Sequence, residues 1–234
     1  MTELLSRPIK DIVTDDHRTA AVFEKHGIDF CCRGNTPLDK ACSDKGIAVE
    51  TLVHELSDVT RVPETAAPKF NEWELDRLAD HIVTMHHEYI RAAVPTMLAH
   101  LNKVATVHGA HHPEMVRVRD IFARTADDLL QHTQMEEMIL FPMIRAIAQD
   151  RRAGRPVTPG MVDGPINVMM SQHVTAGSEI EEIRALTNNY TLPADGCMTY
   201  QVTLQELAVF EEDLHRHVHL ENAILFPRAI AESK

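Results

Sequence analysis

The sequence predicts an all-α protein in which a small all-helical N-terminal domain precedes an up-down-up-down four-helix bundle. Two observations support this prediction. Apolar residues recur at steps of three and four along four long segments of residues 72–234, and short connections separate these segments. One segment also occurs twice, as DLLQHTQMEEMILFP at 128–142 and as DLHRHVHLENAILFP at 213–227. Long helices joined by short loops pack as antiparallel neighbours, which gives a bundle.

Residues 1–60 contain short helical segments separated by turn signals. Pro8 and Pro37 each mark the start of a helix, because proline is tolerated in the first turn. Gly27 suits the position just after a helix end. The loop that follows, residues 28–35, reads IDFCCRGN. We therefore expect a small helical domain with a cysteine-bearing loop.

Residues 61–71 are expected to form a linker, because they contain two prolines and several small residues. The bundle domain then covers 72–234. Pro142 and Pro227 each follow the repeated Glu by six residues, and they should bend or end their helices just beyond it. The four helices are expected at about 72–104, 113–149, 164–187 and 194–231.

Composition narrows the function classes. The net charge of −12 argues against nucleic acid and anionic membranes as partners. The chain contains no apolar run near the ~20 residues of a membrane span, and its N-terminus lacks the apolar core of a signal peptide. We therefore expect a cytoplasmic protein without structural disulfides, although it has four cysteines.

The repeated segment carries candidate metal ligands. In each copy a His is followed four residues later by a Glu, as His132 with Glu136 and His217 with Glu221. Residues four apart lie on one face of a helix. Imidazole and carboxylate are both good ligands for a divalent transition metal. Each copy therefore predicts half of a metal site.

Two further histidines complete the pattern. His87 precedes His132 by 45 residues, and His173 precedes His217 by 44. Both fall on the apolar stripes of their helices. His86 lies on a competing stripe, so position alone does not exclude it, but the internal repeat favours His87.

Two more histidines are expected to be solvated. His215 and His219 stand two residues to either side of His217, which places them roughly 200° around the helix from it.

The number and type of these ligands favour two ions over one. Six side chains on one ion would leave no open position, whereas two ions could share the carboxylates and a solvent-derived oxo or hydroxo bridge. Nitrogen and oxygen ligands without thiolate suit iron or manganese and could hold zinc. The predicted ligands are His87, His132, Glu136, His173, His217 and Glu221.

Asp128 and Asp213 stand four residues before the repeated histidines. A metal-bound His usually donates its other ring N–H to a carboxylate or carbonyl. We expect these acids to accept such a bond from their own His or from one on a neighbouring helix. The alternative is a solvated helix acid.

Cys31 and Cys32 are adjacent in the loop, and a disulfide between neighbours would be strained. Either the pair is one buried and one incidental thiol, or it is redox-active, iron-binding or nitrosyl-accepting. Arg33 next to it would favour the thiolate. Cys42 and Cys197 are interpreted as core residues.

These motifs resemble a known family. His-x3-Glu-x4-Phe-Pro on two helices resembles the hemerythrin-like fold, and Asp-Phe-Cys-Cys-Arg-Gly resembles the small domain that precedes it in the di-iron repair-of-iron-centres proteins. The resemblance covers residues 5–60 and 72–232. It implies two iron ions per chain on the six positions above, with Cys31 and Cys32 as functional thiols. Oxygen-carrying hemerythrins have a further His where this chain has Gly177, which argues against oxygen carriage.

The resemblance implies the repair of iron–sulfur clusters damaged by nitrosative or oxidative stress. Repair would proceed by iron donation, by nitric oxide reduction at the di-iron site, or by both, so an enzymatic nitric oxide reductase activity stays open. Damaged iron–sulfur proteins would be its clients, and a homodimer is compatible with the sequence. The alternatives are a module that binds or senses oxygen or nitric oxide without turnover, and a structural metal bundle.

Overall fold

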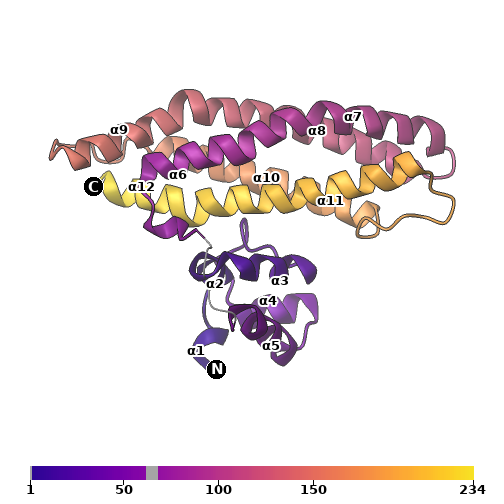
Figure 1. Ribbon diagram of the computed structural model, residues 1–234, viewed down its shortest axis with the longest axis horizontal. Helices are drawn as coiled ribbons and strands as arrows, with labels where there is room; N and C mark the ends of the chain where they lie inside the picture. Colours follow the sequence, from indigo (N-terminus) through magenta and orange to yellow (C-terminus); the bar gives the residue numbers. More distant parts are fainter. Residues whose placement is uncertain (1, 62–67) are drawn as a thin grey trace.

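The structure is a computed structural model that describes residues 2–61 and 68–234. Its described residues form helices and turns without a strand; Pro8 and Pro37 make an isolated β-bridge. A long helical bundle carries a smaller helical domain on one side (Figure 1). The all-α bundle with a small N-terminal helical part is therefore confirmed.

The N-terminal part is built from short helices around a core of large apolar residues. Phe23 and Phe30 are fully buried there. Gly27 and Gly46 adopt left-handed backbone conformations, with φ of 62° and 65°, just after the helices α3 (Ala20–Lys25) and α4 (Leu38–Lys45). The elements are α1 (Thr2–Leu5), α2 (Ile9–Asp15), η1 (His17–Thr19), α3 (Ala20–Lys25), α4 (Leu38–Lys45) and α5 (Val49–Thr60).

Four long helices make the bundle in the described part of the chain, and three of them contain a π turn. The connection to them includes η2 (Phe70–Glu72), while residues 62–67 of the expected linker lie outside the described residues. In chain order the four are α6 (Leu75–Ile82), η3 (Val83–His87) and α7 (Glu88–His108); α8 (Pro113–Met135), η4 (Glu136–Leu140) and α9 (Phe141–Arg152); α10 (Asp163–Leu186); and α11 (Met198–His219), η5 (Leu220–Leu225) and α12 (Phe226–Glu232).

Pro142 and Pro227 were expected to bend or end their helices, and neither ends one. Pro142 and Pro227 lie in the first turns of α9 and α12, directly after the π turns. In these turns the N–H of Phe141 bonds to the carbonyl of Glu136, five residues back, and Phe226 bonds to Glu221 in the same way. A proline can follow without ending the helix, because the widened π turn already departs from the regular pattern of backbone hydrogen bonds.

The apolar core divides into two clusters along the bundle. One combines the N-terminal part with α7, most of α8, the second half of α10 and α11. The other combines α6, α9, the first half of α10, η5 and α12. The candidate ligands lie between the clusters on every helix, so the site is a buried polar layer inside an otherwise apolar bundle.

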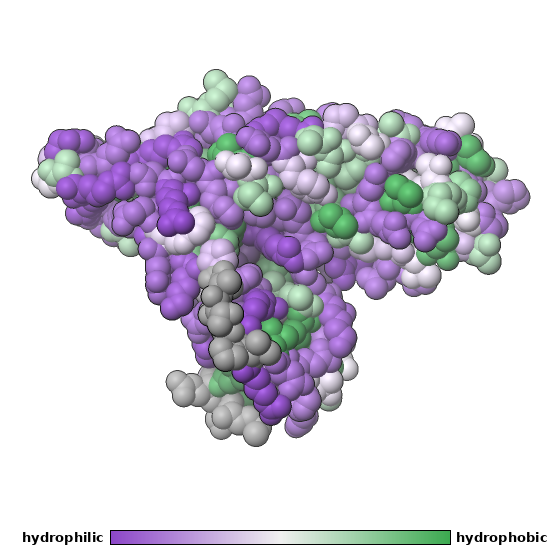
Figure 2. Space-filling view, in the orientation of Figure 1, coloured by the Kyte–Doolittle hydropathy of each residue, from purple (hydrophilic) through white to green (hydrophobic). Residues whose placement is uncertain are grey.

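The molecular surface is polar on the side that faces the reader in Figure 2. The face shown in Figure 2 is mostly hydrophilic, with scattered apolar residues. Among the described helices, none combines the length and the apolar character needed to cross a membrane.

Candidate metal centre

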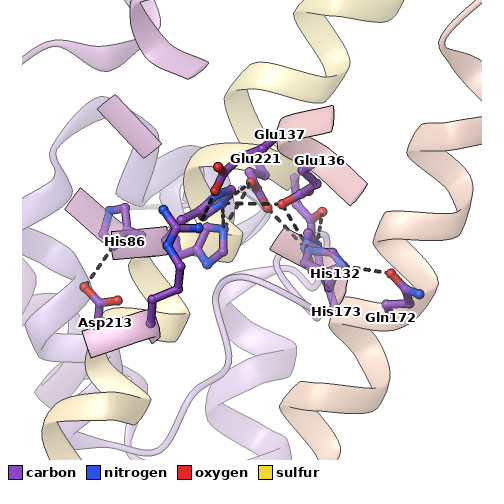
Figure 3. A network of polar contacts seen from close by, with 12 residues as sticks. His86, His132, Glu136, Glu137, Gln172, His173, Asp213 and Glu221 are labelled. Atoms are coloured by element: carbon purple, nitrogen blue, oxygen red, sulfur yellow. Dashed lines mark hydrogen bonds and ion pairs between the residues drawn. The ribbon is translucent and has the colours of Figure 1, made fainter. Parts of the chain in front are cut away.

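The six predicted ligands converge in the polar layer of the bundle, and Figure 3 labels four of them, His132, Glu136, His173 and Glu221. They come from η3, α8, η4, α10, α11 and η5, and each is at most 3% exposed. They form two groups, His87 with His217 and His132 with His173, and each group also includes Glu136 and Glu221. Within each group the potential ligand atoms lie within 4.8 Å of one another.

The spacing of the imidazoles fits two ions. The Nε2 atoms of His87 and His217 are 3.2 Å apart, and those of His132 and His173 are 3.0 Å apart. Two nitrogens bound at right angles, each roughly 2.1 Å from one ion, would be about 3.0 Å apart. Each histidine pair can therefore chelate one ion.

Both glutamates reach both groups. Glu136 Oε2 lies 3.4 Å from His87 Nε2 and 3.3 Å from His132 Nε2. Glu221 places Oε1 3.1 Å from His217 Nε2 and Oε2 3.1 Å from His173 Nε2. These carboxylates are placed where a bridge between two ions would have to stand.

The donor set fits metal cations. Both carboxylate oxygens of Glu136 and Oε2 of Glu221 are buried without a hydrogen-bond partner. A buried carboxylate without a hydrogen bond or a cation is costly. Bound cations would remove that cost, and nitrogen and oxygen donors suit iron or manganese.

When no metal is bound, protons on the imidazoles balance the negative charge of the two carboxylates. Burial alone would lower the pKa of His87, but its contacts with Glu136 and Glu221 outweigh burial and raise this pKa to about 10. Burial would also lower the pKa of His132, but the contact of this ring with Glu136 outweighs burial and raises the pKa to about 9. Although burial opposes ionisation, the neighbouring imidazoles hold the pKa of Glu221 well below its usual value. Metal binding must therefore displace protons from the imidazoles.

Three of the ligand rings are held from outside the centre. His87 Nδ1–H donates to Glu137 Oε1 at 2.9 Å, and Glu137 is also paired with Arg91 at 2.6 Å. A ring that donates through Nδ1 presents the Nε2 lone pair to the centre.

His132 and His173 are held in the same way. His132 Nδ1–H donates to Gln172 Oε1 at 2.8 Å, and His173 Nδ1–H donates to Asn222 Oδ1 at 3.0 Å. Glu137, Gln172 and Asn222 were not predicted. Each is the sequence neighbour of a candidate ligand on another helix, and that adjacency is the signal that could have revealed them.

The contacts of Asp128 and Asp213 match the prediction only in part. The Asp128 side chain is exposed and lines a cleft beside His132. Asp213 accepts a hydrogen bond from His86 Nδ1 at 2.8 Å, and the His86 ring stacks on the ring of His217. Asp213 therefore serves a histidine on a neighbouring helix, but His86 is not one of the six predicted ligands. The Nδ1 atom of His132 bonds to Gln172, and the Nδ1 atom of His217 is buried without a hydrogen-bond partner, so neither acid serves the histidine four residues after it.

The prediction that His215 and His219 are solvated is wrong. His219 is 4% exposed, and the side chain of His215 is 13% exposed. Both rings pack edge-on against Phe30 of the N-terminal part. Helical periodicity correctly predicted that these two rings face away from the centre. It could not predict that the N-terminal part covers that face of the helix.

The cysteine loop lies against the centre. Cys31 and Cys32 are free thiols whose sulfurs are 3.8 Å apart. Cys32 Sγ donates to the main-chain oxygen of His173 at 3.3 Å. Asn222 Nδ2 donates to the Cys31 carbonyl at 3.5 Å, so this one amide contacts both the loop and a candidate ligand.

The thiolate expected from Arg33 is not supported. Arg33 pairs with Glu181 at 3.7 Å, and burial raises the pKa of Cys31 well above its usual value. Gly177 explains how the loop approaches so closely, because a Cβ at this position would lie 3.0 Å from Cys32 Sγ. The space that a histidine at 177 would need is occupied by the cysteine loop.

The other two cysteines differ from each other. Cys42 is fully buried, as predicted. The interpretation of Cys197 as a core residue is wrong, because this thiol is exposed directly before the start of α11 at Met198. The backbone N–H of Tyr200, together with the His108 ring 3.2 Å away, lowers the pKa of Cys197 to about 7.

A cleft between α8 and α10 leads to the second histidine pair. It has a volume of about 260 Å³, and His132 and His173 form part of its wall. Asp128, Gln172 and Glu179 also line it. Ions and small molecules therefore have a polar approach to this side of the centre.

Comparison with known proteins gives consistent matches. Residues 78–229 match the hemerythrin HHE cation binding domain, and residues 5–60 match a domain of unknown function, DUF542. The chain is 30% identical to the iron-sulfur cluster repair protein ScdA of Staphylococcus haemolyticus, over 93% of this chain and 95% of that protein. It is 33% identical to the iron-sulfur cluster repair protein YtfE of Dickeya chrysanthemi, over 91% of each chain. It is 32% identical to a probable iron-sulfur cluster repair protein of Haemophilus influenzae, over 90% of this chain and 91% of that protein.

Proposed function

Because this chain belongs to the iron–sulfur cluster repair family, with a hemerythrin HHE cation binding domain as its bundle, we propose that it is a non-haem di-iron protein that repairs damaged iron–sulfur clusters. The observation that carries this proposal is the pair of buried carboxylates shared between two histidine pairs. A single-ion site would not need both glutamates to face both pairs.

Iron bound at this centre would supply redox chemistry, positions for small ligands such as nitric oxide, and a store of iron for a client protein. The residues of the chain prepare the site for this role. Glu137, Gln172 and Asn222 hold three imidazoles with Nε2 directed inward. The apolar clusters on both sides bury the polar layer, and the cleft between α8 and α10 leaves one approach to it.

Iron donation requires a centre that stays folded when it is emptied. Without iron, the two glutamates would be left as buried charges in the bundle. The high pKa values of His87 and His132, about 10 and about 9, mean that their Nε2 atoms accept protons as the centre empties. Loss of iron is thus coupled to proton uptake, and the bundle avoids an uncompensated buried charge.

Reconstitution of a client tests the proposal. The reduced, iron-loaded protein is mixed without oxygen with an iron–sulfur enzyme whose cluster has been damaged by nitric oxide. We expect the enzyme to regain activity while this protein loses iron. A separate reaction with nitric oxide alone distinguishes turnover to nitrous oxide from a stable nitrosyl complex.

Two variants sharpen this test. Cys31→Ser with Cys32→Ser should keep the iron of the bundle and impair repair, while Cys42→Ser serves as the matched control at a buried thiol outside the loop. If the iron-loaded protein restores no activity and forms only a stable nitrosyl, the protein is a binding or sensing module and the repair proposal fails.

A further inference from the structure

The loop between α3 and α4 brings a third group of metal-binding side chains together, outside the centre described above. Asp29, Cys31 and Cys32 place one carboxylate oxygen and two sulfurs within 4.8 Å of one another. Thiolate sulfur attracts a different set of metals from the nitrogen and oxygen donors of the bundle.

The distance between the sulfurs fits a shared ion. Two thiolates that bind one tetrahedral ion at about 2.3 Å are about 3.8 Å apart. The Sγ atoms of Cys31 and Cys32 are 3.8 Å apart, whereas a disulfide needs about 2.05 Å. Asp29 Oδ1 lies 3.1 Å from Cys31 Sγ, so a carboxylate stands beside the same position.

The loop is fixed in this shape before any ion binds. Asp29 Oδ1 accepts hydrogen bonds from the backbone N–H groups of Cys31 at 3.0 Å and Cys32 at 2.8 Å. Gly34 closes the loop, because a Cβ there would lie 2.3 Å from the Phe30 carbonyl oxygen and 2.7 Å from Lys10 Cβ. Little conformational entropy remains to be lost when an ion binds.

We propose that Asp29, Cys31 and Cys32 form a second metal site, which binds one thiophilic divalent cation such as Fe²⁺ or Zn²⁺. Binding replaces the two S–H bonds by two sulfur–metal bonds and releases two protons to solvent, without a change of oxidation state. The fourth position of the ion is left for solvent or a client ligand.

The resting thiols suit an acceptor of this kind. Cys31 is only 7% exposed, so the surrounding protein shields its sulfur from oxidants in the solvent. A bound metal ion displaces the thiol protons, so ion binding itself forms the thiolates. Cys32 is partly exposed and gives solvent access to the pair.

The position of the site suggests its use, and this step rests on the proposed repair function. Cys32 Sγ touches the main-chain oxygen of His173, and Asn222 joins the Cys31 carbonyl to the His173 ring. An ion held by the loop would therefore lie beside a candidate ligand of the bundle centre. The site would therefore receive iron that leaves the bundle on its way to a client.

Cobalt binding tests the site directly. Co²⁺ is added without oxygen to the full chain after the bundle has been loaded with iron, and the iron content is measured again afterwards. We expect about one further ion per chain and a thiolate-to-cobalt charge-transfer band. Cys31→Ser and Cys32→Ser should each abolish the band.

Asp29→Asn examines the carboxylate separately. The amide keeps the oxygen that accepts the two backbone N–H bonds, so the loop should keep its shape, while cobalt affinity should fall by about tenfold or more. Cys197→Ser is the control at an exposed thiol beside His108 and should leave the band unchanged.

A measurement on the unaltered chain guards against misfolded variants. Phenylarsine oxide bridges two neighbouring thiols, so one equivalent should remove the cobalt band. The proposal is overturned if both thiols are free by titration and no thiolate band forms, or if the band survives either serine variant. Failure of cluster repair with an intact cobalt site would instead reject the proposed function alone.

Discussion

Replacing Glu136 by Gln tests whether the glutamates are shared between two ions. The amide keeps the size of the side chain and removes its charge. Glu136 Oε2 lies 3.4 Å from the Nε2 atom of His87 and 3.3 Å from that of His132, so the change removes one of four candidate ligands from each group. His217 belongs to one group only.

The two variants should therefore lose different amounts of iron. An outer partner of a ligand typically contributes about 10–100-fold in metal affinity, and a direct bridging ligand should exceed this at both positions. We expect Glu136→Gln to fall from about two irons per chain to less than one. His217→Ala should keep about one iron, held by the pair of His132 and His173.

Iron per chain after equilibrium dialysis, together with the visible spectrum, measures this difference. Glu137→Gln is the matched control on the same turn, because Glu137 contacts Arg91 and the ring of one candidate ligand, His87, and it should weaken one position by about 10–100-fold. The helical circular dichroism signal verifies folding. If Glu136→Gln retains a full iron per chain, as His217→Ala should, the carboxylate does not bridge and the shared-ligand reasoning is refuted.

Three further predictions follow from contacts around the centre and at the domain boundary. His87→Ala should lose iron from its group, whereas His86→Ala should keep the iron content, and equal losses in iron analysis would contradict this assignment. Asn222→Ala removes the acceptor of the His173 ring N–H and should weaken iron binding by about 10–100-fold, measured by competition with a chelator; unchanged affinity would show that the bond is incidental. Burial, with the nearby Glu212, raises the pKa of Glu24 from 4.5 to about 7, so ionisation of this carboxyl destabilises the folded state as the pH rises from 4.5 through 7. Glu24→Gln should therefore stabilise the protein by up to roughly 3 kcal/mol at pH 8 and have little such effect at pH 4, measured by denaturant unfolding, and an equal effect at both pH values would contradict this.

The internal repeat made the inner part of the site predictable. A ligand such as His132 must stand on the buried stripe of its helix, and a second copy of the same pattern at His217 distinguishes it from an incidental polar residue. All six residues chosen on this basis lie together in the structure. Periodicity worked here because it reports which side of one helix faces inward.

The outer contacts were not predictable in the same way. The partner of a ligand ring depends on how one helix is rotated against the next, so Asp128 was expected and Gln172 was found. Burial of His219 depends on where the N-terminal part packs against the bundle. The apolar periodicity of a single helix does not predict that position. Exposure of Cys197 followed from a helix boundary that lies four residues later than expected, at Met198.

The π turns leave a trace in the sequence that periodicity analysis can recover. Around η4 the buried positions Glu136, Leu140 and Ile144 follow His132 at three successive steps of four. An ordinary α-helix averages 3.6 residues per turn, so three such steps exceed it by about one residue. The π turn contains this extra residue, so the helix continues beyond it.

This extra residue limits how the centre can be transferred to other proteins. Deleting one residue from η4 would restore regular winding and rotate everything beyond it by about 100° relative to the ligands. Phe141 and the remaining core residues of α9 would then leave the apolar cluster that they now fill. A designer who copied only the two histidine pairs and the two glutamates onto a straight four-helix scaffold would misalign one end of the bundle. The graft must therefore include the inserted residue in each of the three helices that have a π turn in the described part of the chain.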